Sequence, residues 1–139
     1  MQTRRFSSDL KTPVSGNHTG LYAVPIQLDR ADLPAMDDAA LARRFSGQPI
    51  LLDRPLAVVA LYLDAQGAME EHSAPVPILL LVTGGSGFVR VGGPAGAARA
   101  VAAGDAVLWP AGVDHLLWTS DEPLQAIAIE GPEERGSGG

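Results

Sequence analysis

The stretch that decides the fold lies between residues 104 and 115 and reads Gly104-Asp105-Ala106-Val107-Leu108-Trp109-Pro110-Ala111-Gly112-Val113-Asp114-His115. Its first glycine opens a turn into a short apolar strand, and Pro110 with Gly112 shapes a tight turn where that strand ends. The next strand begins at His115, and because side chains alternate along a strand, Leu117 and Thr119 share its face. The stretch therefore predicts two short strands joined by a tight turn, with a histidine at the start of the second.

Segments with the composition of strands continue on both sides of this stretch, and turn signals such as those at residues 66–67 and 84–85 separate them. The expected strands are Leu21–Leu28, Pro49–Leu52, Leu56–Asp64, Met69–Ser73, Ile78–Thr83, Phe88–Val91, Ala98–Ala102, Ala106–Trp109, His115–Thr119 and Leu124–Ile129. Many short strands with at most one helix predict an all-β sandwich or a small barrel.

Charge and composition divide the chain into three parts. Seven of the ten basic residues lie in the first 54 positions, and the more apolar remainder has the character of a buried body. We therefore expect an N-terminal extension at residues 1–50 that packs on a barrel at residues 51–130, followed by a flexible tail at residues 131–139. The extension contains one expected helix, at Ala39–Arg44.

Composition also excludes several classes of protein. The chain has 139 residues, of which 46% are hydrophobic and 19% charged, so it is a single folded domain and not a disordered chain. Its net charge of −6 argues against nucleic acid or an anionic membrane as partner, and the absence of cysteine excludes disulfides and thiolate chemistry. The apolar run from Leu56 to Leu63 is too short to span a membrane, and the N-terminus lacks a secretory pattern. A cytoplasmic protein is expected.

Residues 104–115 match the second motif of the cupin family, G(x)5PxG(x)2H, at every fixed position. The family pattern continues with an asparagine four residues after the histidine, where this chain has Thr119. The stretch is therefore similar to the strand, turn and strand that carry the last metal ligand in that family.

The first cupin motif, G(x)5HxH(x)3,4E(x)6G, is matched only in part. His72 stands at the first histidine position, but Ala74 replaces the second histidine and Ile78 replaces the glutamate. The closing glycine is present as Gly85, and Gly67 lies one residue too close to His72. The chain resembles a small single-domain cupin with an intact second motif and a degenerate first motif.

This resemblance implies a double-stranded β-helix barrel of the jelly-roll type, with a divalent metal such as Fe, Mn, Ni or Zn inside it. Of the metal ligands, only His72 and His115 are carried over, whereas a mononuclear site normally needs three protein ligands. Glu70 shares the strand face of His72, so it is the candidate substitute carboxylate. The alternative to a metal site is a pair of histidines in a cavity, hydrogen-bonded to each other or to water.

The aliphatic replacements predict that part of the ancestral site has become a small, mostly apolar pocket. The expected pocket-lining residues are His72, Ala74, Ile78, His115, Leu117 and Thr119. The favoured function is small-molecule binding, as in a sensor or storage module.

Two enzymatic readings stay open beside it. One is a metal-dependent dioxygenase or isomerase that uses His72 and His115. The other is a metal-free isomerase or epimerase with His72 or His115 as general base. The sequence shows no acid partner for it, although the fold could bring in Tyr22 or Tyr62. The remaining histidine, His18, lies in a polar loop and is expected to be incidental.

A homodimer is expected because the chain has more apolar strand faces than one barrel interior can bury. The run from Leu56 to Leu63 is apolar on both parities, and an inward Leu117 sends Leu116 and Trp118 outward. Exposed stripes of this kind usually mark an interface.

Overall fold

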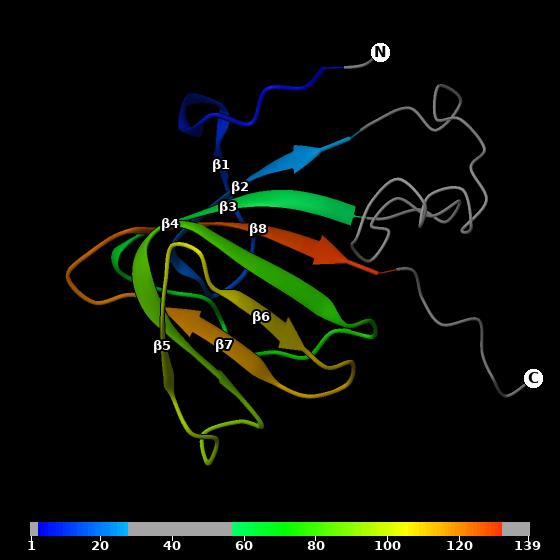
Figure 1. Cartoon of the computed structure of the whole chain (residues 1–139), viewed down its shortest axis with the longest axis vertical. Helices are drawn as coiled ribbons and strands as arrows, with labels where there is room; N and C mark the ends of the chain where they lie inside the picture. Colours follow the sequence, from blue (N-terminus) through cyan, green and yellow to red (C-terminus); the bar gives the residue numbers. More distant parts are fainter. Residues whose placement is uncertain (1–2, 28–56, 132–139) are drawn as a thin grey trace, which may run out of the picture.

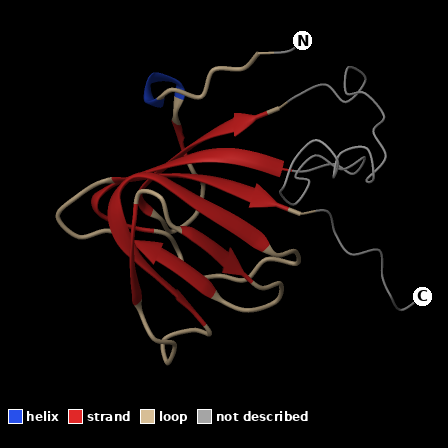
Figure 2. Ribbon diagram, in the orientation of Figure 1, coloured by secondary structure: helices blue, strands red, loops and turns tan. Residues whose placement is uncertain are grey.

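Eight antiparallel strands build the barrel seen in the computed structural model, which describes residues 3–27 and 57–131 (Figures 1 and 2). The strands are β1 (Thr12–Pro13), β2 (Thr19–Ile26), β3 (Ala57–Ala68), β4 (Ile78–Val91), β5 (Arg99–Ala102), β6 (Ala106–Trp109), β7 (His115–Trp118) and β8 (Leu124–Glu130). The described residues contain one helical element, the 3-10 turn η1 at Ser8–Leu10. The expected helix at Ala39–Arg44, the expected strand at Pro49–Leu52 and the tail from residue 132 onward lie outside the described residues.

Two strand layers share the long strands β3 and β4. In one layer β2 pairs with β3, the first part of β3 pairs with β8, and the first part of β4 lies between β8 and β6. In the other layer the second part of β4 lies between β5 and β7, and β7 reaches Ala68 at the end of β3. The expectation of an all-β barrel is confirmed.

The turn expected at residues 84–85 is wrong, because strand β4 covers these residues. The strand runs through this point and shifts register between Val82 and Gly84 as it passes from one layer to the other. Gly85 has φ +72°, and a Cβ built there would lie 1.8 Å from the carbonyl oxygen of Pro123. Glycine is required at this crossing because both the conformation and the close approach of β8 exclude a side chain.

The turn expected at residues 66–67 is also wrong. Strand β3 continues through this point to Ala68, and Gln66 within it has φ +58°. The strand expected at Met69–Ser73 is absent from the described residues. Within that segment only His72 forms a β-bridge, and its partner is His115. The strand expected at Ala106–Trp109 is confirmed at the same bounds as β6.

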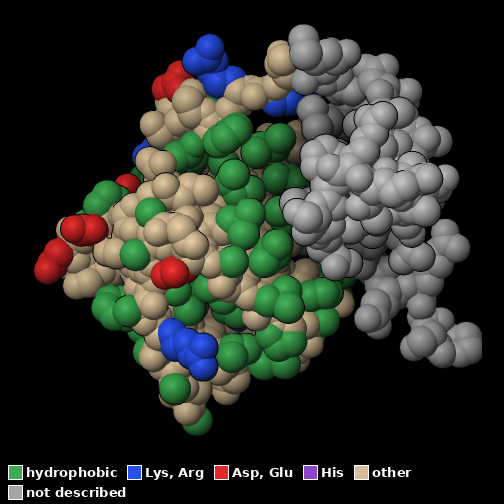
Figure 3. Space-filling view, in the orientation of Figure 1, with side chains coloured by type: hydrophobic (Ala, Val, Ile, Leu, Met, Phe, Trp, Pro, Cys, Tyr) green, Lys and Arg blue, Asp and Glu red, His purple; other side chains and the backbone are tan. Residues whose placement is uncertain are grey.

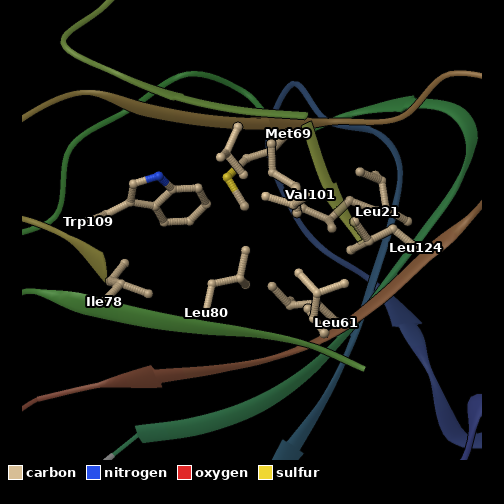
Figure 4. Packing of buried hydrophobic residues seen from close by; sticks show 13 residues of the cluster. Leu21, Leu61, Met69, Ile78, Leu80, Val101, Trp109 and Leu124 are labelled. Carbon is tan, nitrogen blue, oxygen red and sulfur yellow. The ribbon is translucent and has the colours of Figure 1, made fainter. Parts of the chain in front are cut away.

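The core lies between the two layers and consists of the inward side chains of alternating strand positions (Figure 4). Leu63, Leu80 and Leu117 are at most 1% exposed. In β7, His115 and Leu117 are buried while Leu116 and Trp118 are half-buried, which confirms the expected alternation. No helix in the described part of the chain is long and apolar enough to cross a membrane.

Candidate functional site

His72 and His115 meet where the start of β7 faces the segment before β4. The backbone N–H of His115 donates to the carbonyl of His72 at 2.8 Å, and the N–H of His72 donates back at 3.3 Å. Their imidazole centroids are 4.6 Å apart, with the planes inclined at 63°. His115 is 1% exposed, whereas His72 is exposed. The pair therefore leads from the surface into the core.

His115 has an unusual environment for a buried polar side chain. Its ring stacks on Trp109 with centroids 4.2 Å apart and planes within 6° of parallel. Both ring nitrogens are buried, and neither makes a hydrogen bond of normal geometry with residues 3–27 and 57–131, although the Val113 backbone lies close enough to act on the ring. Burial lowers the pKa of His115 to about 4, and the nearby His72 adds to this, while Asp114 and the Val113 backbone oppose it. At neutral pH the ring is uncharged.

His72 is oriented by the backbone of Glu70. The Nδ1 atom of His72 lies 2.7 Å from the Glu70 carbonyl oxygen, so in the neutral ring Nδ1 carries the proton and donates it. The Nε2 atom is then left as an acceptor. This assignment follows from the carbonyl, which can only accept.

His18 joins the histidine pair, although sequence reasoning treated it as incidental. Its Nδ1 accepts the backbone N–H of Glu70 at 2.8 Å, and its ring centroid lies 6.4 Å from that of His72. The three histidines of the chain thus form a row from the N-terminal segment to the core. No local pattern signals this, because it depends on how β2 and the loop before it lie against β3.

The proposed substitute ligand Glu70 is occupied elsewhere. Its side chain is exposed, and Oε2 accepts the backbone N–H of Asn17 at 3.3 Å. Among the residues that the structure describes, no group of three His, Cys, Asp or Glu side chains could hold a metal ion. Two imidazoles beside aliphatic Ala74 and Ile78 do not fit the donor set of a mononuclear divalent metal.

Three of the expected pocket residues belong to the packed interior. Ile78 and Leu117 are members of the core cluster, and the half-buried Ala74 packs against it.

Thr119 is 5% exposed, and its hydroxyl is engaged: Oγ1 accepts the N–H of Gly67 at 2.9 Å and donates to the carbonyl of Asp64. This hydroxyl therefore braces the irregular end of β3.

Glu130 is a carboxylate that sequence reasoning missed. It pairs directly with Ile78 across β8 and β4, so it lies on the face that carries the inward Ile78, and it is half-buried. Directly opposed residues in antiparallel strands have Cβ atoms about 4.5–5.5 Å apart. A negative charge therefore lies beside the position where the cupin motif has its glutamate.

A cleft of about 580 Å³ lies where β5 and β6 diverge from β4. Its lining includes Val89, Arg99, Val101, Val107 and Trp109. Trp109 connects the cleft to the histidines, since the same indole stacks on His115.

The tyrosines considered as acid partners do not meet the histidines. The hydroxyl of Tyr62 donates to the carbonyl of Phe6, and the Lys11 ammonium lies 4.5 Å from the centre of the Tyr22 ring. The two tyrosines pair across β2 and β3, on the face opposite the buried Leu21 and Leu63.

Comparison with solved structures identifies the fold. The polyketide cyclase RemF from Streptomyces resistomycificus aligns with a TM-score of 0.64 at 11% identity, over 93% of this chain and 79% of RemF. A cupin-like protein from Thermotoga maritima aligns with a TM-score of 0.57 at 23% identity, over 89% and 73% of the two chains. An RmlC-like cupin with a double-stranded β-helix fold from Methanocaldococcus jannaschii aligns with a TM-score of 0.51 at 15% identity, over 56% and 71%.

Other similar structures are matched over less of their length. The chain spans 66% of a Streptococcus pyogenes protein of unknown function and 41% of the DMSP lyase DddQ from Ruegeria pomeroyi, each at 23% identity and a TM-score of 0.52. No family model and no curated protein matches the sequence. The chain has the cupin fold, and at these identities the likeness shows the fold alone.

Proposed function

We propose that this cupin barrel binds a small organic molecule, and that the ligand hydrogen-bonds to the imidazole of His115. The observation that carries the proposal is the pair of buried nitrogens on that ring, which the described residues leave without partners. An unsatisfied buried polar group costs about 1–3 kcal/mol. A hydroxyl or carbonyl group of a ligand would remove that cost, because a neutral imidazole offers one donor and one acceptor.

Binding is favoured over base catalysis by the protonation behaviour of His115. A general base works best when its pKa lies near the working pH. With a pKa of about 4, His115 is a weak base at neutral pH but a good hydrogen-bonding group. The exposed His72, whose Nε2 has no hydrogen-bond partner among residues 3–27 and 57–131, offers a second polar contact at the entrance.

A metal-dependent enzyme that uses His72 and His115 is the second candidate, and the resemblance to the cupin motifs supports it. The two imidazoles do not by themselves satisfy a divalent ion. Metal analysis of protein purified without chelator separates the two functions. Stoichiometric metal that disappears in the His72→Ala, His115→Ala double variant would favour the metal enzyme.

The binding proposal is tested by NMR on protein with ¹⁵N-labelled histidine, titrated with phenol and with benzamide as hydroxyl and amide probes. We expect the ring ¹⁵N resonances of His115 to shift, while those of His18 shift less. Ring shifts at His18 alone, with His115 unmoved, would contradict the proposal. His115→Phe, which keeps an aromatic ring against Trp109, is the control for binding that does not involve the imidazole nitrogens.

A further inference from the structure

We propose that the ligand is a small hydroxy acid or oxo acid, with its carboxylate bound by Arg99 and its hydroxyl or carbonyl group bound by His115. This inference rests on the proposed function and names the chemical class of the ligand. It starts from the cleft between β4, β5 and β6, whose volume of about 580 Å³ suits a small organic molecule.

Strand register places Arg99 on the inner face of the barrel. Arg99 lies directly opposite Val89 in the β4–β5 ladder, and Val89 is 4% exposed. It also alternates with the buried Val101 along β5, so the two side chains share a face. Burying an unpaired arginine would be costly, and Arg99 is an exposed residue, so it stays accessible to water and to a ligand.

Arg99 has no acidic partner among the described residues. The ion pair that the described structure contains joins Arg90 to Glu71 at 2.9 Å, and the Arg90 guanidinium also lies 5.8 Å from the Trp118 ring centre. Arg90 alternates with the inward Val89, so its charge is neutralised on the outer face. Arg99 therefore offers an unused fork of donors that matches a carboxylate.

Asp105 also lines the cleft, but its carboxylate is engaged. Its Oδ2 accepts the backbone N–H of Ala102 at 2.8 Å, which closes the turn between β5 and β6. Figure 3 shows basic side-chain atoms low on this face of the molecule, with hydrophobic and other atoms around them and an acidic side chain above. Between positions 55 and 130 the chain has only two basic residues, Arg90 and Arg99, and its net charge is −6. The unpaired positive charge of Arg99 in the cleft therefore favours a ligand that carries a negative charge.

The second contact follows from the same inner face. Val89 pairs with Arg99 on one side and with Leu117 on the other, and Val91 pairs with His115. Arg99 and His115 are thus two strands and two residues apart, a backbone separation of about 12 Å. The long side chain of Arg99 reduces the distance that a ligand has to cover between its guanidinium group and His115. A molecule with an acid at one end and a hydroxyl or carbonyl at the other can span it, with its apolar body along Val89 and Val91. His115 is 1% exposed and does not itself line the cleft, so the hydroxyl or carbonyl end has to reach it past Trp109, which does.

Three probes of matched shape test the proposal. We would titrate 4-hydroxyphenylacetate, phenylacetate and 4-hydroxyphenethyl alcohol, which carry both groups, the acid alone and the hydroxyl alone. The readout is the fluorescence of Trp109 in the Trp118→Phe variant, because the chain has two tryptophans and only Trp109 lines the cleft. The hydroxy acid is expected to bind at least about tenfold more tightly than either partial probe.

Variants assign each end of the ligand. Arg99→Gln should weaken binding of both acids about tenfold and leave the alcohol unchanged, and Arg99→Lys should restore part of the loss. Lys11→Gln is the control, since it removes a basic residue that lies over the Tyr22 ring and does not line the cleft. His115→Phe should weaken both phenols and spare phenylacetate.

The outcomes separate this inference from the function on which it rests. Equal binding of the alcohol and the hydroxy acid, or an Arg99→Gln variant that binds the acids normally, would overturn the role of Arg99 while binding at His115 still stood. Arg99-dependent binding of phenylacetate with no effect of His115→Phe on either phenol would instead overturn the role of His115. If none of the three probes binds, the proposed ligand class is wrong.

Discussion

The imidazole of His115 lies flat against the indole of Trp109, with ring centroids 4.2 Å apart and planes within 6° of parallel. The contact joins β6 to β7 inside the barrel and covers one face of a ring whose nitrogens are unpartnered among the described residues. Stacking supplies the packing, while the open hydrogen-bonding positions leave the site ready for a polar ligand group.

Burial of His115 predicts a loss of stability in mild acid. The unfolded chain binds a proton near pH 6.5, whereas folded His115 binds one only near pH 4. Between these values the unfolded state holds more protons, so this contribution is present above pH 6.5 and is lost as pH falls toward 4. Between pH 6.5 and 4 the free energy of unfolding of the parent protein should fall by up to about 3 kcal/mol more than that of the His115→Phe variant, which lacks this titrating group. Urea unfolding of both proteins measures it, and identical pH profiles would contradict the buried neutral ring.

The Thr119 hydroxyl predicts a specific cost at the end of β3. Thr119→Val removes the acceptor for Gly67 and the donor to Asp64, so stability should fall by about 1–3 kcal/mol. Thr83→Val, at an exposed position of β4, is the matched control and should change stability by no more than about 0.5 kcal/mol. Chemical denaturation of the two variants is the measurement. Equal effects would show that the hydroxyl does not brace the strand.

Replacing Gly85, where β4 crosses between layers, should destabilise the protein more than replacing Gly92, although both glycines have a positive φ. Gly92 has φ +93° and no atom within 4 Å of the position that a Cβ would take, whereas a Cβ at Gly85 would meet the Pro123 carbonyl. Gly92→Ala should cost about 1–2 kcal/mol from backbone strain alone. Gly85→Ala adds a backbone collision and should cost about 3 kcal/mol or more. If the melting temperatures of the two variants agree, β8 does not approach β4 as closely as described.

Restoring the cupin ligands with Ala74→His and Ile78→Glu should raise affinity for divalent metal, because the missing donors return. Without metal the double variant should lose about 2–4 kcal/mol, since a carboxylate replaces a buried isoleucine and lies beside Glu130. Titration calorimetry with Zn²⁺ and thermal melts with and without metal measure the two effects. A variant that binds Zn²⁺ no better than the parent would count against the degenerate-site interpretation.

We also predict a two-fold homodimer that buries more than about 1,000 Å² in total. Trp118 stacks on Phe88 at 5.6 Å on the outer face of β7 and β4, and Leu116 lies half-buried on the same face. Light scattering at micromolar concentration gives the mass. A value of 14.4 kDa, that of the single chain, would refute the prediction.

Local sequence was sufficient where structure depends on neighbours along the chain. The bounds of β6, the tight turn after Trp109 and the inward direction of His115 and Leu117 all follow from alternation and from Pro110 and Gly112. The pairing of His72 with His115 came from the cupin resemblance and not from spacing alone. Two turns were misplaced, at Gln66-Gly67 and Gly84-Gly85, because glycine also occurs where a strand bends, and only pairing with another strand distinguishes a bend from a turn.

The sequence by itself therefore determined the strand composition, the cupin motif and the loss of two metal donors at Ala74 and Ile78. Tertiary structure alone decided that His18 lies beside His72, that Trp109 covers His115, and that Glu130 stands opposite Ile78. It also placed Arg99 on the inner face opposite Val89. These contacts join residues on different strands or loops, some far apart in the chain and some on consecutive strands, as for Trp109 and His115. Each therefore depends on how strands pair and in what register, which alternation along a single strand does not encode.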